Sequence, residues 1–178
     1  EFNKYILETL NPLDFSTYPD LSFCYKNLEK IFEITENNTI LVNGSDGGIR
    51  EVNFILNNLF QPIILQPTFA MISIYPANLG NNPISVKYSY KNNKLKIDQN
   101  DLLKKISLSK KPPLVIIASP DSPTGCTLSI NEIQRLISEV EKKEGLFLLD
   151  GTYSLIKGYE YMLEIINIIN SSNNAIFT

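Results

Sequence analysis

Short apolar runs alternate with amphipathic stretches along the 178 residues, and this alternation constrains the fold more than any other feature. It is typical of an α/β fold whose mostly parallel sheet carries helices on both faces. We expect strands at Thr39–Val42, Pro62–Leu65, Ile84–Tyr88, Leu114–Ala118, Leu146–Leu149 and Ala175–Thr178. We expect helices at Leu21–Phe32, Asp46–Leu59, Phe69–Ala77, Asp98–Ser107, Ile130–Lys143 and Tyr161–Asn170.

Two of the expected helices carry an apolar stripe at helical spacing. The helix Ile130–Lys143 has a capping-box pattern at its start, formed by Ser129 and Glu132. Its apolar stripe consists of Ile130, Ile133, Leu136, Ile137 and Val140. The helix Leu21–Phe32 carries a similar stripe. We interpret both stripes as packing faces, not as binding sites.

Composition excludes several classes of protein. The net charge is −3, from 16 basic and 19 acidic residues without a basic stripe, so nucleic acid is not an expected partner. Histidine is absent, which removes His-based triads and His metal sites, and we expect no metal. Cys24 and Cys126 are interpreted as reduced thiols of a cytoplasmic protein. No apolar run approaches the length of a membrane span.

Polar turns directly follow two of the buried runs, at Ser119–Gly125 and at Asp150–Tyr153. Open α/β sheets bind ligands at the carboxyl edge, where such turns lie. A carboxylate at position 150 there can pair with a protonated pyridine nitrogen, and Tyr153 can donate to a ring oxygen. The alternative is that Asp150 caps the next segment and that Tyr153 is a half-buried aromatic. For the turn at Ser119–Gly125, the most specific of these segments, the alternative is a rigid connector.

Two earlier strand ends carry weaker signals. Asn43–Gly48 opens a helix, and the N–H groups of Ser45, Asp46 and Gly47 can bind a phosphate there. The alternative is an ordinary capped helix, since Ser and Asp are common caps. Phe69, in the next such turn, can stack on a flat ring or belong to the core.

Taken in chain order, the four turns resemble those of the fold-type I pyridoxal phosphate (PLP) enzymes: Asn43–Gly48, Gln66–Ala70, Ser119–Gly125 and Asp150–Tyr153. The chain is similar to the class I/II aminotransferases, in their histidinol-phosphate aminotransferase-like branch. The resemblance implies an aspartate aminotransferase-like large domain, here truncated. Residues 1–20 would form an N-terminal segment that leads into the large domain, and residues 21–178 would form part of the PLP-binding large domain.

The resemblance also implies roles for single residues. Ser45, Asp46 and Gly47 would hold the cofactor phosphate, and Phe69 would stack on the ring. Asp150 would pair with the ring nitrogen N1, and Tyr153 would donate to the phenolic oxygen O3′. Tyr18, in the segment Thr17–Asp20, would reach the phosphate of a neighbouring subunit, which implies a homodimer.

The sequence departs from the family pattern at two places. Ser122 stands where the family usually has an Asn that hydrogen-bonds O3′, so this contact is in question. The Schiff-base lysine is absent from the sequence and is expected just after Thr178. We therefore expect that the natural polypeptide continues, and that this segment holds no catalytic residue of its own.

The resemblance implies a PLP-dependent transferase of the cytoplasm. It would move an amino group between an amino acid, phosphorylated amino acids included, and a keto acid. One alternative is a PLP-dependent decarboxylase of a phosphorylated amino acid on the same fold. Another is a non-catalytic fragment or pseudoenzyme, which the missing lysine favours and the intact Asp150–Tyr153 pair disfavours.

Overall fold

The structure, a computed structural model, describes residues 2–11, 13, 16–32, 34, 36–91 and 93–178. The chain forms two compact units, Glu1–Ile40 and Leu41–Thr178. The first unit contains α1 (Phe2–Thr9), α2 (Ser22–Phe32) and the 3₁₀ turn η2 (Glu36–Asn38). The second unit contains the sheet and the remaining helices.

The sheet of the second unit has six strands in the order β3-β2-β1-β4-β5-β6. Their bounds are β1 Gln61–Gln66, β2 Ile84–Lys91, β3 Lys94–Ile97, β4 Pro113–Ala118, β5 Leu146–Asp150 and β6 Ala175–Phe177. All neighbours pair in parallel except β2 and β3, which form an antiparallel hairpin. The mostly parallel sheet predicted from the sequence is therefore confirmed.

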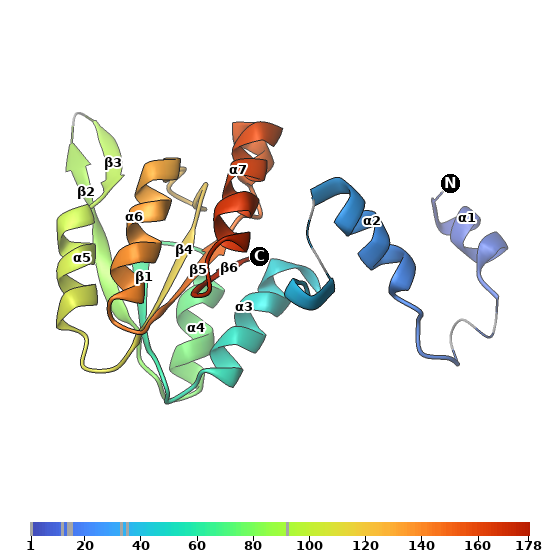
Figure 1. The fold of residues 1–178 in the computed structure, drawn as a ribbon, viewed down its shortest axis with the longest axis horizontal. Coiled ribbons are helices and arrows are strands. Elements are labelled where there is room, and N and C mark those ends of the chain that lie inside the picture. The colour runs from blue at the N-terminus through green and yellow to red at the C-terminus, as the bar shows by residue number, and fades with distance from the viewer. Residues whose placement is uncertain (1, 12, 14–15, 33, 35, 92) are drawn as a thin grey trace. The chain divides into compact units, whose positions relative to one another are not determined.

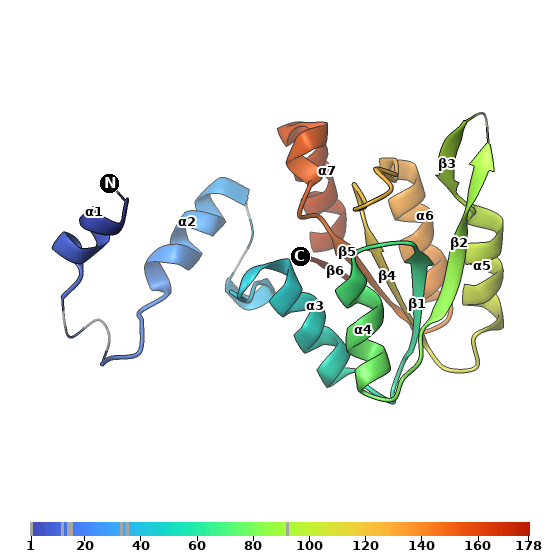
Figure 2. The ribbon, with the colours of Figure 1, turned by 180° about the vertical axis from the view of Figure 1, so that it is seen from behind.

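Helices cover both faces of the sheet (Figures 1 and 2). One face carries α3 and α4, and the other carries α5, α6 and α7. The helix bounds are α3 Gly44–Ile55, α4 Ala70–Asn78, α5 Gln99–Leu108, α6 Ile130–Glu141 and α7 Tyr159–Asn170.

Successive strand residues enter opposite cores because side chains alternate across a sheet. In β1, Ile63 packs with the α5–α7 layer and Ile64 packs with the α3–α4 layer. Every residue of β4 is buried, as expected for a parallel strand that is covered on both sides. Because the central strands are buried on both faces of the sheet, their apolar runs in the sequence are unbroken.

The start of α6 confirms the predicted capping box. The side chain of Ser129 accepts a hydrogen bond from the N–H of Glu132, and the Glu132 carboxylate accepts one from the N–H of Ser129. The stripe behind it is buried, at Ile133, Leu136, Ile137 and Val140.

Two sequence predictions are wrong. Residues Thr39–Val42 form no strand, and no strand of the described sheet pairs with them. The Val42 carbonyl instead accepts the N–H of Gly44 at 2.9 Å, in the turn that opens α3. The stripe of α2 is not a buried face either, because none of the residues described in α2 is buried. Ile31, for example, is 52% exposed.

The order of the strands creates a switch point between β1 and β4. After β1 the chain proceeds to β2 and β3, and then returns past β1 to form β4, β5 and β6. The connections that leave β1 and β4 therefore run in opposite directions. In open α/β sheets such a point, at the carboxyl ends of the strands, is where ligands bind.

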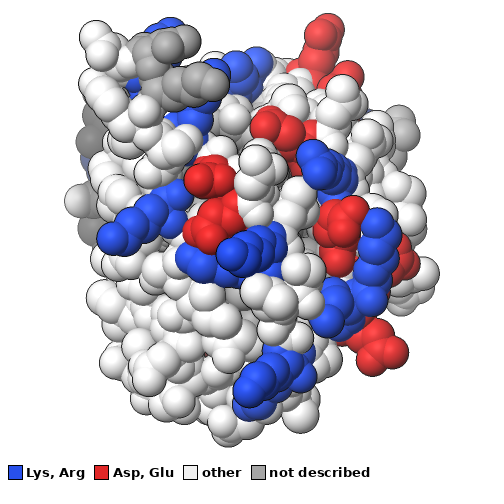
Figure 3. Space-filling view, turned by 90° about the vertical axis from the view of Figure 1, so that its left-hand side faces the viewer, with Lys and Arg blue, Asp and Glu red and all other residues white. Residues whose placement is uncertain are grey.

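Charges of both signs are intermixed on the face of the molecule drawn in Figure 3. In α5, Lys105 and Asp101 form an ion pair at 2.8 Å. Within the described residues, no helix combines the length and the apolar character that crossing a membrane requires.

Candidate functional site

A chain of hydrogen bonds joins the end of β5 to the start of α3. Asp150, the last residue of β5, is only 5% exposed. Its Oδ1 accepts hydrogen bonds from the N–H of Thr152 at 3.0 Å and from the Thr152 hydroxyl at 2.6 Å. The Thr152 hydroxyl in turn lies 2.6 Å from the Ser45 hydroxyl. The predicted sites Ser45 and Asp150 are thus brought together through a third residue.

The N-terminus of α3 presents backbone donors at the same place. No described residue accepts a hydrogen bond from the N–H of Ser45 or Asp46, and the bond from Gly47 N–H to Asn43 is long at 3.4 Å. Gly44 has φ +69°, a left-handed conformation that suits glycine at this turn. These open N–H groups and the helix dipole attract an anion.

Glycine at position 48 lets α3 approach the end of the sheet closely. A Cβ there would lie 3.0 Å from Thr178 Cγ2 and 3.5 Å from Val42 Cγ2. Thr178 is itself tied to the end of β5, since its carbonyl accepts the Gly151 N–H at 2.8 Å. The start of α3 therefore lies next to Asp150 through the close approach of Gly48 to Thr178 as well as through the contact between the Ser45 and Thr152 hydroxyls.

A second network links the loops after β1 and β4, at the switch point. Asp121 is 4% exposed, and its carboxylate accepts hydrogen bonds from the hydroxyls of Thr68 and Thr124. The Thr124 bond and the left-handed Gly125 (φ +68°) close the proline loop on itself, whereas the Thr68 bond ties it to the loop that carries Phe69. The position of Ser122 relative to Phe69 is therefore fixed by Asp121.

The other predicted residues are accessible. Phe69 is 37% and Tyr153 is 46% exposed, and Ser122 is exposed on the proline loop. No described residue forms a hydrogen bond with the hydroxyl of Ser122 or Tyr153, so both are available to a ligand. Tyr18 belongs to the first unit, and its side chain is fully exposed.

Sequence reasoning missed the residues that connect the predicted ones. Thr152 lies between Asp150 and Tyr153. An Asp side chain commonly bonds the backbone N–H two residues on, as Asp150 does here, but this rule does not predict the second bond from the Thr152 hydroxyl. Thr68 and Asp121 are 53 residues apart, so no local pattern pairs them. The hydroxyl of Tyr75 donates to the Asp46 carboxylate at 2.8 Å, and this bond raises the pKa of Tyr75.

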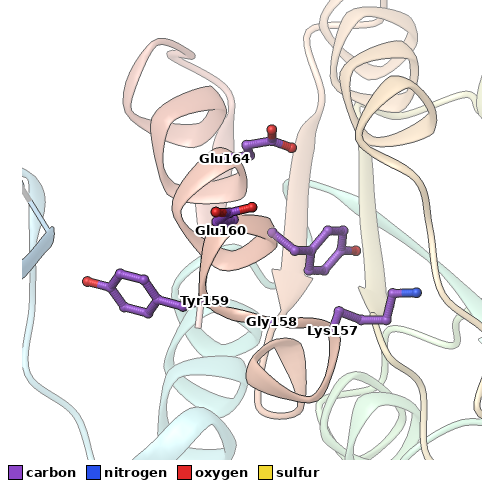
Figure 4. A pocket seen from close by; sticks show the side chains of 6 residues that line it. Lys157, Gly158, Tyr159, Glu160 and Glu164 are labelled. Atoms are coloured by element: carbon purple, nitrogen blue, oxygen red, sulfur yellow. The ribbon is translucent and has the colours of Figure 1, made fainter.

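A hollow of about 500 Å³ lies at the start of α7. It is lined by Lys157, Gly158, Tyr159, Glu160, Tyr161 and Glu164. Figure 4 shows the side chains of Lys157 and Tyr159 extending to opposite sides. None of the predicted site residues lines it. Among the described residues no group of three or more metal-ligating side chains occurs.

Known proteins resemble the chain over most of its length. The sequence profile of the family described as "Aminotransferase class I and II" matches residues 14–160. The chain belongs to this family. The histidinol-phosphate aminotransferase of Aquifex aeolicus is 28% identical over 173 residues, and that of Pelagibacter ubique is 30% identical over 149 residues. These alignments cover 91% and 82% of the chain but only 44% and 40% of the relatives, so the chain spans less than half their length.

Solved structures of aminotransferases share the fold. A putative histidinol-phosphate aminotransferase from Erwinia carotovora atroseptica superposes with a TM-score of 0.81 at 19% identity, over 93% of this chain and 48% of that one. The histidinol-phosphate aminotransferase of Sinorhizobium meliloti, solved with pyridoxal 5'-phosphate, gives 0.77 at 19% identity, over 92% and 44%. The predicted aminotransferase-like fold is confirmed.

Loss of the Thr68 hydroxyl is expected to destabilise the fold. The substitution Thr68→Val keeps the shape of the side chain but leaves one oxygen of the buried Asp121 carboxylate without its donor. We expect the free energy of unfolding to fall by about 1.5–3 kcal/mol, the usual range for a hydrogen bond to a charged group. Thr127→Val is the matched control, because its hydroxyl makes only a 3.4 Å contact with the Gly125 carbonyl. Equal effects of the two variants in urea unfolding would contradict the role given to Asp121.

The stability of the fold is expected to fall at alkaline pH. The Tyr88 hydroxyl is shielded from solvent, and burial raises its pKa well above the ordinary value of about 10. The unfolded state therefore loses this proton first as the pH rises. The contribution of Tyr88 to the free energy of unfolding is fully present below about pH 10 and is lost as the pH rises above that value.

Urea unfolding at about pH 8 and about pH 11 measures this loss. We expect a smaller loss in Tyr88→Phe than in the control Tyr90→Phe, because Tyr90 is 70% exposed. Burial also raises the pKa of Tyr161, so part of the alkaline loss remains in Tyr88→Phe. Identical pH profiles of the two variants would sink the assignment to Tyr88.

Proposed function

We propose that this chain is the cofactor-binding part of a PLP-dependent aminotransferase. The observation that carries the proposal is the hydrogen-bonded connection of Asp150 to Ser45 through Thr152. It joins a buried carboxylate to a helix N-terminus with open N–H groups. The carboxylate can accept a hydrogen bond from a protonated ring nitrogen, and the open N–H groups can bind a phosphate.

The chemistry of the donors and acceptors fits this cofactor. Oδ1 of Asp150 accepts two hydrogen bonds, whereas Oδ2 accepts none from any described residue. This oxygen has a free acceptor position for the pyridine N1–H. The N–H groups of Ser45 and Asp46, with that of Gly47, would receive the phosphate.

When bound, PLP withdraws electrons from the substrate carbon through its protonated ring. The residues of this chain would bind and orient it. The Asp150 carboxylate would hold the proton on N1, because an opposite charge favours the charged form of the ring. Phe69 would cover one ring face, while Tyr153 and Ser122 would donate to O3′. None of these roles requires the Schiff-base lysine that the family resemblance implies.

The reaction that we propose is transfer of an amino group between an amino acid, phosphorylated amino acids included, and a keto acid. Both curated relatives named above are histidinol-phosphate aminotransferases, which favours transamination over decarboxylation. The fold does not choose the reaction, since a PLP-bound C-S lyase from Staphylococcus hominis superposes with a TM-score of 0.64.

We further propose a homodimer that works in the cytoplasm. Tyr18 would reach the phosphate site of the neighbouring subunit, and its fully exposed side chain supports this role. The free cysteines Cys24 and Cys126 fit a reducing compartment. Residues 1–20 would serve as the segment that carries Tyr18, and residues 21–178 as part of the PLP-binding domain.

A titration with PLP tests the proposed function. We expect the apoprotein to bind PLP, and Asp150→Asn to weaken binding at least about tenfold, since the partner of the ring proton is lost. Asp98→Asn is the control, because Asn preserves the N-cap that Asp98 provides for α5. Binding is measured from the absorbance of bound PLP after equilibrium dialysis. Equal affinity of Asp150→Asn and wild type would contradict the proposal.

A further inference from the structure

Thr152 holds both ends of the proposed PLP site at once. Its N–H and its hydroxyl both donate to Asp150 Oδ1, and its hydroxyl oxygen also contacts the Ser45 hydroxyl. It is the only described residue that forms side-chain hydrogen bonds with both predicted sites. Its side chain is exposed, so packing does not explain its position.

The direction of these bonds follows from the number of protons. A hydroxyl has one proton to donate, and an ionised carboxylate only accepts. Thr152 therefore donates to Asp150, and Ser45 donates to Thr152. The bonds at 2.6 Å are consistent with a charge-assisted chain that ends on the carboxylate.

Because Thr152 donates both bonds to Asp150, it also sets the orientation of the carboxylate. Two donors on Oδ1 fix the rotation of the carboxylate, and Oδ2 is left as the oxygen that faces no described donor. Without the Thr152 hydroxyl, the carboxylate keeps only the bond from the backbone N–H and can turn. The Ser45 side chain loses its only hydrogen-bond partner among the described residues.

We propose that Thr152 is a positioning residue that aligns the ring-nitrogen partner and the phosphate donor together. The inference rests on the proposed function, because it assigns Asp150 and Ser45 their PLP contacts. Thr152 itself would contact neither end of the cofactor. Its hydroxyl would orient the side chains of both Ser45 and Asp150.

Three probes separate the two ends of the site. Inorganic phosphate occupies only the phosphate end, pyridoxal only the ring end, and PLP both. We expect Thr152→Val to lower the affinity for PLP about tenfold or more and to weaken binding of both partial probes. Ser45→Ala should weaken only phosphate and PLP, and Asp150→Asn only pyridoxal and PLP.

Two matched variants distinguish positioning from a general structural effect. Thr152→Ser retains the hydroxyl and should restore affinity to near the wild-type value, whereas Thr127→Val should change none of the three affinities. The double variant Ser45→Ala/Thr152→Val should bind phosphate no more weakly than the poorer single variant, because the two residues act in one chain. Circular dichroism and the urea midpoint verify that each variant folds.

The protonation of bound PLP gives a second readout. If Thr152 orients Asp150, the pH at which the bound ring loses its proton should fall by about one unit in Thr152→Val and not in Thr152→Ser. The inference is overturned if wild type binds PLP and Thr152→Val matches it in affinity and in pH profile, or if Thr152→Ser fails to rescue. If wild type binds none of the probes, the proposed function and the inference fail together.

Discussion

The parallel pairing of β4, β5 and β6 is the constraint on which the candidate site depends. It places Asp150 at the carboxyl end of β5 beside Ala118 of β4, with Thr178 immediately after β6. Gly48 then permits α3 to approach Thr178, and the hydroxyls of Ser45 and Thr152 complete the connection. A buried carboxylate and an anion-attracting helix start are neighbours because the strands are in this register.

The switch point between β1 and β4 supplies the second half of the site. Asp121 joins the two loops that diverge there, and it does so with a nearly buried carboxylate. Leaving such a group without donors is expensive, so the bonds from Thr68 and Thr124 hold the loops in one arrangement. Phe69 and Ser122 are carried on these loops. Phe69 and Ser122 are accessible to a ligand, whereas the Asp121 carboxylate that holds their loops is buried.

Much of the fold could be predicted because burial on both sheet faces leaves a local signal. The runs that became β1, β4 and β5 are apolar throughout, and the capping box of α6 lies within four residues. The strand β3 was missed, because its alternating Lys and apolar residues mark an edge strand that only its hairpin partner defines. Residues Thr39–Val42 were wrongly assigned to a strand, because a local apolar run does not show whether a strand of the sheet lies beside it, and in the described sheet none pairs with it. The Thr68–Asp121 bond could not be read from the sequence, because only the fold brings these residues together.

The central claim is that the Asp150 carboxylate holds a proton on the pyridine nitrogen of PLP. Nuclear magnetic resonance of the protein with PLP labelled with ¹⁵N at the ring reads this proton directly. The account predicts a ¹⁵N shift typical of a protonated pyridine at neutral pH in wild type, and of an unprotonated ring in Asp150→Asn. An unprotonated ring in the wild-type complex at neutral pH would contradict it.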